Sequence, residues 1–254
     1  MQKVIEQRDI LFSLVAKNIK TKYAGSLLGV LWAFINPLLL ALIVGFVFTQ
    51  VFKANVENFY LFIIAGMFPW TFFASSLQEA AVSVPSNAAV LKQFSFSRMF
   101  IPLAVVLTNF IVFGCSLLVL LPFFIMVKSS VVFMLPLLLV AMFFLFLFTA
   151  GISLMLAAWC VEVRDINQFL GTLLMFWLWL TPVFYAADMV PAAYRGWFAF
   201  NPVNPYMELF RAALLGSGLA HPLNLLVVFA SSVAVMWAGV VIFNTKAGNF
   251  LRRI

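Results

Sequence analysis

Six long apolar runs separated by short polar stretches organise the chain. Each run has about 20 residues or more with no central Asp, Glu, Lys or Arg, as expected of a helix that crosses a bilayer. The predicted spans are residues 30–52, 59–77, 101–127, 131–158, 169–187 and 223–244. We therefore expect an all-α polytopic membrane protein with a single membrane domain over residues 1–254.

The segment 4–22 precedes the first run and has a different pattern. Apolar residues recur there at helical spacing, while Lys17 and Lys20 occupy other faces. This pattern predicts an amphipathic helix at the cytoplasmic interface of the membrane. The alternative is a solvated basic leader that only orients the first span.

The polar stretch 83–98 lies between the second and third predicted spans. Ser86 follows Pro85 and can cap a short helix that runs through Lys92. A short cytoplasmic helix between two spans suits docking to a partner protein. A plain connector fits the same residues.

The stretch 188–222 contains four prolines and no apolar run long enough to cross a bilayer. It predicts re-entrant or interfacial helices between spans five and six. Backbone broken by proline at membrane depth persists only where protein or a wet cavity satisfies its polar groups. We therefore expect this segment to cap a pathway.

Composition supports a membrane protein, and charge supplies its orientation. Hydrophobic residues make up 65% of the chain and charged residues only 9%, with a mean hydropathy of +1.13. A soluble domain carries about 25% charged residues. Four of the 15 Lys and Arg residues lie on one side of the predicted spans: Lys53, Lys128, Arg195 and Arg211. The others lie on the side of both termini, which predicts cytoplasmic termini. Short basic clusters between spans, rather than one basic stripe, argue against nucleic-acid binding.

The sequence lacks the motifs of an energy-converting or catalytic protein. It has no G-x-x-x-x-G-K-[ST] motif to hold nucleotide phosphates. Its one histidine, His221, does not make a zinc site, and Cys115 and Cys160 are interpreted as packing residues. We expect no catalytic residue, no metal ligand and no cofactor bound by this chain. Any energy source must then be a separate chain.

Aromatic residues are abundant in and beside the spans. Most such rings in membrane proteins face lipid or form interfacial belts. Sugar rings can also stack on aromatic rings, so an aromatic pore would suit a long glycan. The candidates for lining a channel are Trp32, Phe34, Phe176, Trp177, Phe184 and Tyr185.

Three segments in the same order carry a family resemblance. They are YAGSLLGVLWAFINPL at 23–38, VRDI at 163–166 running on to LTPVFY at 180–185, and Asn201-Pro202 with Glu208 and Arg211 downstream. Together with the six-span layout, they resemble the permease subunit of type-two ABC exporters, in the branch that exports O-antigen, capsule or teichoic acid chains. The resemblance covers essentially the whole chain.

The resemblance implies a homodimer that encloses a channel in the cytoplasmic (inner) membrane. Two cytoplasmic ATPase subunits, which use ATP and Mg, would drive lipid-linked polysaccharide of O-antigen type through it. The first and fifth spans would line the channel. Candidate coupling residues are Lys17, Lys20, Ser86, Asn87, Lys92, Phe94 and Arg98. Candidate residues of the exit cap are Trp197, Asn201, Glu208 and Arg211.

Two other interpretations stay open at the level of sequence. One is a permease of the same superfamily that moves teichoic acid, capsule, lipid or drugs. The other is a membrane-embedded enzyme acting on lipid-linked glycans, which would need carboxylates in a groove. The exterior acids Glu57, Asp188 and Glu208 are spread over two loops.

Overall fold

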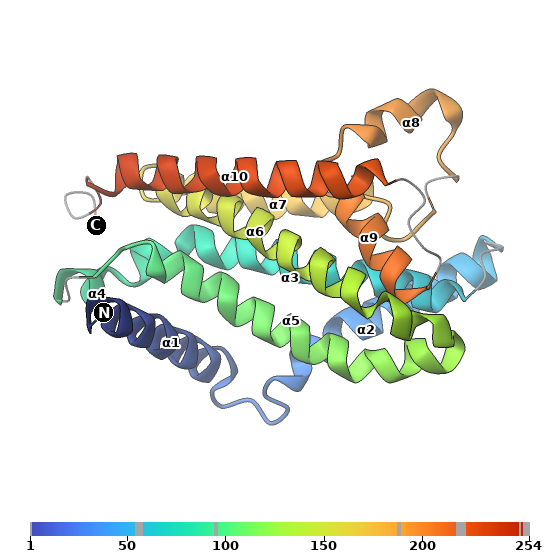
Figure 1. Cartoon of the computed structure of the whole chain (residues 1–254), viewed down its shortest axis with the longest axis horizontal. Helices are drawn as coiled ribbons and strands as arrows, with labels where there is room; N and C mark the ends of the chain where they lie inside the picture. Colours follow the sequence, from blue (N-terminus) through green and yellow to red (C-terminus); the bar gives the residue numbers. More distant parts are fainter. Residues whose placement is uncertain are drawn as a thin grey trace.

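The computed structural model describes residues 2–53, 58–93, 96–186, 189–216, 222–248 and 250. For residues 2–7, 192, 195, 197 and 199 it describes the backbone alone. Every regular element in these ranges is helical, as Figure 1 shows. The predictions for Phe94 and His221 fall outside the described residues.

Long helices run side by side along the molecule (Figure 1). The elements are α1 (Gln2–Tyr23), α2 (Leu31–Phe46) with a π-helical turn (Val47–Val51), α3 (Phe59–Ser86), α4 (Ala88–Gln93), α5 (Phe100–Val127), a 3-10 turn (Ser129–Met134) leading into α6 (Leu135–Cys160), α7 (Asp165–Leu180), α8 (Ala192–Ala199), α9 (Asn204–Leu214) and α10 (Leu223–Ala247). Five helical segments are long and apolar enough to cross a membrane: Leu31–Val51, Phe59–Ser86, Phe100–Val127, Ser129–Cys160 and Leu223–Ala247. They coincide with five of the six predicted spans, and a multi-pass helical fold is confirmed.

The second span is longer than predicted, and this changes the interpretation of Ser86. Helix α3 continues through Pro85 and ends at Ser86, so Asn87, not Ser86, precedes α4. The prediction that Ser86 caps the short helix is wrong. The helix continues past residue 77 because tertiary packing outweighs the local proline signal: Ala80, Ala81 and Val84 are fully buried.

The predicted fifth span ends earlier than expected. Helix α7 has 16 residues, or about 24 Å of length, and stops at Leu180 rather than near residue 187. Thr181 takes an extended conformation, with φ −98° and ψ 131°. The cause is Pro182, which disfavours helical geometry in the residue before it and has no N–H to donate. Turns follow over residues 181–185.

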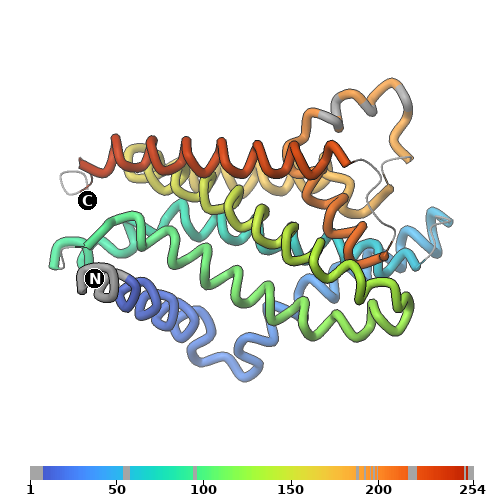
Figure 2. The backbone as a smooth tube through the Cα atoms, in the orientation of Figure 1, coloured from blue at the N-terminus to red at the C-terminus, as the bar shows by residue number. Residues whose placement is uncertain are grey.

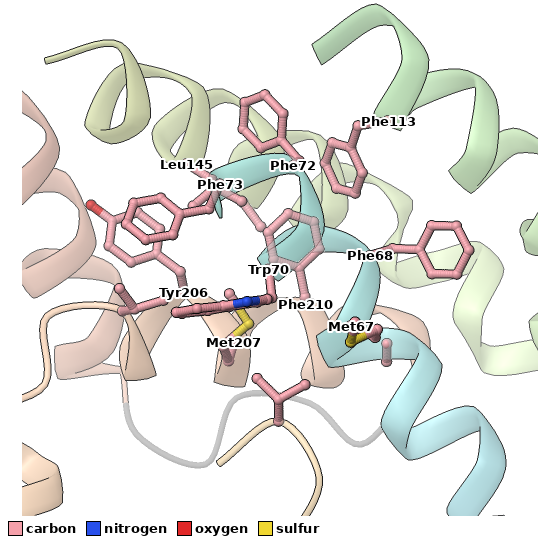
Figure 3. Packing of buried hydrophobic residues seen from close by; sticks show 14 of the residues in the cluster. Met67, Phe68, Trp70, Phe72, Phe73, Phe113, Leu145, Tyr206, Met207 and Phe210 are labelled. Carbon is pink, nitrogen blue, oxygen red and sulfur yellow. The ribbon is translucent and has the colours of Figure 1, made fainter. Parts of the chain in front are cut away.

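Helix α3 forms the centre of the bundle. It packs against α2, α5, α6, α7 and α9. In its most apolar window 72% of the residues are buried, against 17% in α2 and α10. A helix that is apolar on all sides suits such a position. Figure 3 shows Trp70 and Phe73 of α3 gathered with Tyr206 and Phe210 of α9, and Phe113 of α5 beside Phe72.

Helices α6 and α10 approach each other through two glycines. A Cβ atom on Gly239 would come within 2.3 Å of the Gly151 carbonyl oxygen, and one on Gly151 within 2.5 Å of the Val235 carbonyl oxygen. Small residues allow this backbone contact, which is how helices associate in a solvent of lipid. The close packing of α6 against α10 therefore requires glycine at positions 151 and 239.

The bundle has two distinct ends (Figures 1 and 2). Helix α1 begins and α10 ends beside α4, and we name this the α4 end. Helices α8 and α9 and the start of α3 lie at the opposite end, which we name the α9 end. Both ends carry residues that the sequence singled out.

Candidate functional site

At the α9 end, donors from the following residues form hydrogen bonds to the carbonyls at the end of α7. The last four carbonyls of a helix have no partner within it. In α7 the Thr181 backbone N–H donates to the first two at 2.9 and 3.3 Å. The Tyr185 hydroxyl donates to the third at 2.7 Å, and the Asn201 amide donates to the fourth at 3.2 Å. Each of the last four carbonyls of α7 therefore has a hydrogen-bond donor.

Asn201 links this helix end to the entrance of α9. Its amide also donates to the Thr181 hydroxyl at 2.9 Å. Its carbonyl oxygen accepts from the Trp177 indole N–H at 3.0 Å and from the Val203 backbone N–H at 3.0 Å. One amide thus uses both donors and its acceptor to join α7, the following turn and α9.

Arg211 of α9 binds carbonyls further along the chain, in the turn that follows α7. Its guanidinium donates to the carbonyls of Pro182 and Val183, the latter at 3.0 Å. It also lies over the Phe62 ring, 3.8 Å from the ring centroid. Arg211 is only 8% exposed, although its sequence position predicted an exterior loop. Its burial is tolerated because carbonyl dipoles and the face of an aromatic ring replace water around the charge.

The remaining residues predicted for the exit cap contribute less to this network. Glu208 accepts a hydrogen bond from the Asn224 amide, which joins α9 to α10. Trp197 lies in α8, and its backbone alone is described. A residue that the sequence did not single out also anchors α9 to α10: the Tyr206 hydroxyl shares a 2.6 Å hydrogen bond with the Ser232 hydroxyl.

The six aromatic residues predicted to line a channel divide into two groups. Trp32 is 43% exposed and Phe176 is 64% exposed, so both rings are available to a ligand, lipid or partner. Phe34 is half-buried against Phe68, at 5.8 Å between ring centroids.

The other three rings of this set turn toward the protein. Phe184 is 1% exposed and belongs to the core, so the prediction that it faces a pore is wrong for this structure. Trp177 packs edge-on against Phe73, at 5.5 Å between centroids, and its N–H is held by Asn201. Tyr185 is half-buried and packs on Phe198. The turn at Pro182 redirects Phe184 and Tyr185 because the chain no longer follows a helix there, whereas Trp177 lies within α7.

At the α4 end, short polar contacts join helices that are distant in sequence. The Lys17 ammonium donates to the Asn87 side chain at 3.0 Å, which ties α1 to the junction of α3 and α4. Arg98 donates to the backbone carbonyl of Ala247, near the end of α10. Lys246 pairs with Glu162 between α10 and the end of α6. The predicted coupling residues Lys17, Asn87 and Arg98 therefore do lie at one end of the molecule.

Helix α4 packs against the bundle through one side chain and exposes another. Leu91 is buried in a small core with Val84, Ile101 and Phe243. Lys92 is exposed on the same short helix. Lys20 of α1 and Ser86 are exposed as well. This end therefore presents a basic, partly exposed surface that is fixed to the bundle by apolar contacts.

A polar cluster that the sequence did not predict joins α1, α3 and α5. The Lys22 ammonium donates to the Glu79 carboxylate at 2.6 Å and to the Asn109 amide oxygen at 2.7 Å, and Asn109 donates to Glu79 at 3.2 Å. Burial and the Glu79 charge raise the pKa of the neighbouring Tyr23, whose phenol stays protonated at neutral pH. The feature of the sequence that could have indicated this cluster is Asn109, an amide within an apolar run.

Groups of His, Cys, Asp and Glu that could hold a metal ion are absent from the described part of the chain. The pairs Lys22–Glu79 and Lys246–Glu162 join different helices, and Arg211 joins α9 to the turn after α7. These features define a polytopic helical membrane protein whose polar groups hold helices together.

Comparison with known proteins identifies the family. The chain belongs to the ABC-2 type transporter family, whose pattern matches residues 10–215. Members of this family are the membrane-spanning permease subunits of ABC transporters, which assigns the chain a role in transport.

Curated relatives match nearly the whole chain. An O-antigen export system permease protein, RfbA, from Myxococcus xanthus is 30% identical, over 100% of this chain and 98% of the relative. The protein of the same name from Klebsiella pneumoniae is 29% identical, over 95% and 93%. A capsule polysaccharide export inner-membrane protein, CtrC, from Neisseria meningitidis is 22% identical, over 83% and 81%.

Proposed function

We propose that this chain is the channel-forming permease of an exporter that moves lipid-linked polysaccharide of O-antigen type across the cytoplasmic membrane. The similarity to O-antigen export permeases along essentially the full length of both proteins carries the proposal. Capsule export is the second candidate, because the capsule relatives also match over most of the chain, at lower identity.

The proposed architecture has six crossings and cytoplasmic termini. Helix α7 supplies the remaining crossing, and the turn after Pro182 with α8 and α9 forms a re-entrant cap on the exterior. The excess of Lys and Arg on the side of α1, α4 and the end of α10 supports a cytoplasmic α4 end. Seven carbonyls in a row, from residue 177 to 183, accept hydrogen bonds, and such satisfaction is what backbone at membrane depth requires.

The proposed engine is a pair of ATPase subunits bound at the α4 end of a homodimer. Closure of the ATPases would push on α4 and α1, which share the Lys17–Asn87 contact. Rigid spans would convey this movement to the channel. The exposed rings of Trp32 in α2 and Phe176 in α7 would then offer uncharged faces to a passing glycan.

The partner proposal is tested by reconstitution. The chain is co-expressed with candidate cytoplasmic ATPase subunits, purified, and assayed for subunit stoichiometry and ATP hydrolysis. We expect two copies of each subunit and hydrolysis that depends on the complex. A monomer that retains no ATPase would contradict the proposal.

The channel proposal is tested by export of surface polysaccharide. Trp32→Ala and Phe176→Ala should reduce export several-fold while assembly with the ATPase is unchanged. Matched controls are Trp237→Ala and Phe123→Ala, two exposed rings of α10 and α5. Equal export by the test and control variants would show that all four rings merely face lipid.

A further inference from the structure

A cavity of about 300 Å³ opens between α1, α2, α3 and α5. One of its ends is polar and is formed by Lys22, Tyr23, Ser26 and Asn109. The rest of its lining contains four aromatic rings, together with aliphatic and small polar side chains: Trp32, Phe68, Phe72 and Phe113, with Ala33, Pro37, Val112, Asn36, Thr71 and Ser75. We propose that this cavity binds a phosphate-bearing membrane lipid, with the phosphate at the polar end and a hydrocarbon chain along the rings.

The order of the lining residues along α3 matches the long axis of a lipid. Glu79, beside the polar end, lies within the last two turns of α3 at the α4 end. Ser75 is about one turn from Glu79, and Phe68 is about three turns from it. The cavity thus leads from charged groups at the end of a predicted span into its apolar middle, as a lipid does from head group to chain.

The polar end offers hydrogen-bond donors that have no acceptor within the described residues. The Tyr23 hydroxyl is buried there and has no partner. The Lys22 ammonium has three donors and uses two, on Glu79 and Asn109. A phosphate oxygen accepts strongly from both kinds of donor. A purely apolar ligand would leave them unpaired.

Charge around the cavity also favours a phosphate, although Glu79 offsets the charge of Lys22. The positive end of the α2 dipole lies at the cavity, because Trp32 and Ala33 of its first turn line it. Lys17 and Lys20 lie on the same helix, α1, as Lys22. The proposal does not depend on which cargo the exporter carries.

Native mass spectrometry of the purified chain tests the proposal with four probes of stated chemistry. They are phosphatidylglycerol, diacylglycerol with the same chains, a long-chain polyprenyl phosphate, and inorganic phosphate. We expect retention of a phosphate-bearing lipid at least fivefold above diacylglycerol. Phosphatidylglycerol alone would identify a bulk phospholipid as the ligand, and polyprenyl phosphate alone a glycan carrier. Retention of inorganic phosphate without either lipid, or equal retention of diacylglycerol, would overturn the proposal.

Two variants with matched controls locate the site. Lys22→Gln removes the ammonium charge, and Ala33→Phe fills the cavity; each should lower lipid retention at least threefold. Lys246→Gln is the control for charge, since Lys246 is also paired with a glutamate and its side chain is 29% exposed, against 31% for Lys22. Ala234→Phe on the exposed face of α10 is the control for size. Equal losses in test and control variants would contradict a site in this cavity.

Discussion

The α9 end and the α4 end hold their helices together by different chemistry. At the α9 end, Asn201 donates to a carbonyl at the end of α7, Arg211 donates to carbonyls of the turn that follows, and Arg211 is buried. At the α4 end, the pairs Lys22–Glu79 and Lys246–Glu162 join side chains that are partly exposed to solvent.

This difference has an energetic consequence. A buried carbonyl that loses its donor has neither protein nor water as a partner, so the fold loses the full desolvation free energy of that group. A partly exposed ion pair that separates regains water on both sides, and it contributes about 0–1 kcal/mol. The α9 end is therefore expected to be rigid, and the α4 end able to rearrange at small cost. Such a division suits the proposed binding of ATPase subunits at the α4 end.

The largest expected effect is the loss of Arg211. Arg211→Met leaves the carbonyls of Pro182 and Val183 buried without a donor, at a cost of about 3 kcal/mol. The apparent Tm in detergent, measured by differential scanning fluorimetry, should fall by about 6–12 °C. Arg164→Met, at an exposed position before α7, is the control. A shift no larger than that of the control would remove the basis for a rigid α9 end.

Substitution of Asn201 should lower the apparent Tm less than the loss of Arg211, by an amount that depends on the residue introduced. Asn201→Ala removes all its bonds to α7 and α9 and should cost about 2 kcal/mol. Asn201→Asp keeps the acceptor for Trp177 but loses the donors, so its apparent Tm should lie between wild type and Asn201→Ala. Asn244→Ala, exposed on α10, controls for the loss of an amide. An aspartate variant as unstable as the alanine variant would mean that only the donors matter.

A substitution at the contact between α6 and α10 tests whether the rigidity expected of the α9 end extends along the bundle. Gly239→Ala introduces a methyl group against backbone and should cost about 1–3 kcal/mol. Gly114→Ala is the control, because its nearest neighbouring atom would be 3.8 Å away. The apparent Tm of the two variants gives the comparison. Equal values would show that α6 and α10 separate easily.

The smallest effect is expected at the α4 end. Lys246→Gln breaks a partly exposed pair with Glu162 and should lower the apparent Tm by no more than about 4 °C, since such pairs contribute about 0–1 kcal/mol. Addition of 1 M sodium chloride should reduce the difference between wild type and variant, because salt screens exposed charges. A loss as large as that of Arg211→Met would abolish the contrast between the two ends.

Long apolar runs were sufficient to predict the class of fold. Five of the six predicted spans correspond to long helices, and the segment 4–22 lies within α1. This succeeds because in lipid a chain must satisfy its backbone polar groups within each crossing segment, so that run length directly indicates a helix. Basic residues near span ends gave the orientation used in the proposal by the same local reasoning.

Predictions for single side chains were less successful. Phe184 and Phe176 looked alike in sequence, yet Phe184 is buried and Phe176 is exposed. The difference arises from the turn at Pro182, which changes the direction of every side chain after it. Arg211 looked like an exterior charge, and its burial depends on carbonyls about 29 residues away in the chain.

By itself, the sequence determined that this protein is a bundle of apolar helices with a basic N-terminal helix and a proline-broken segment over residues 188–222. Tertiary structure alone decided that α3 lies at the centre, that Lys22, Glu79 and Asn109 meet, and that Asn201 and Arg211 complete the end of α7. The physical reason is the range of the forces. Helix formation in lipid depends on neighbours within a few residues, whereas a partner for a buried polar group can come from any segment that packing brings within about 3 Å.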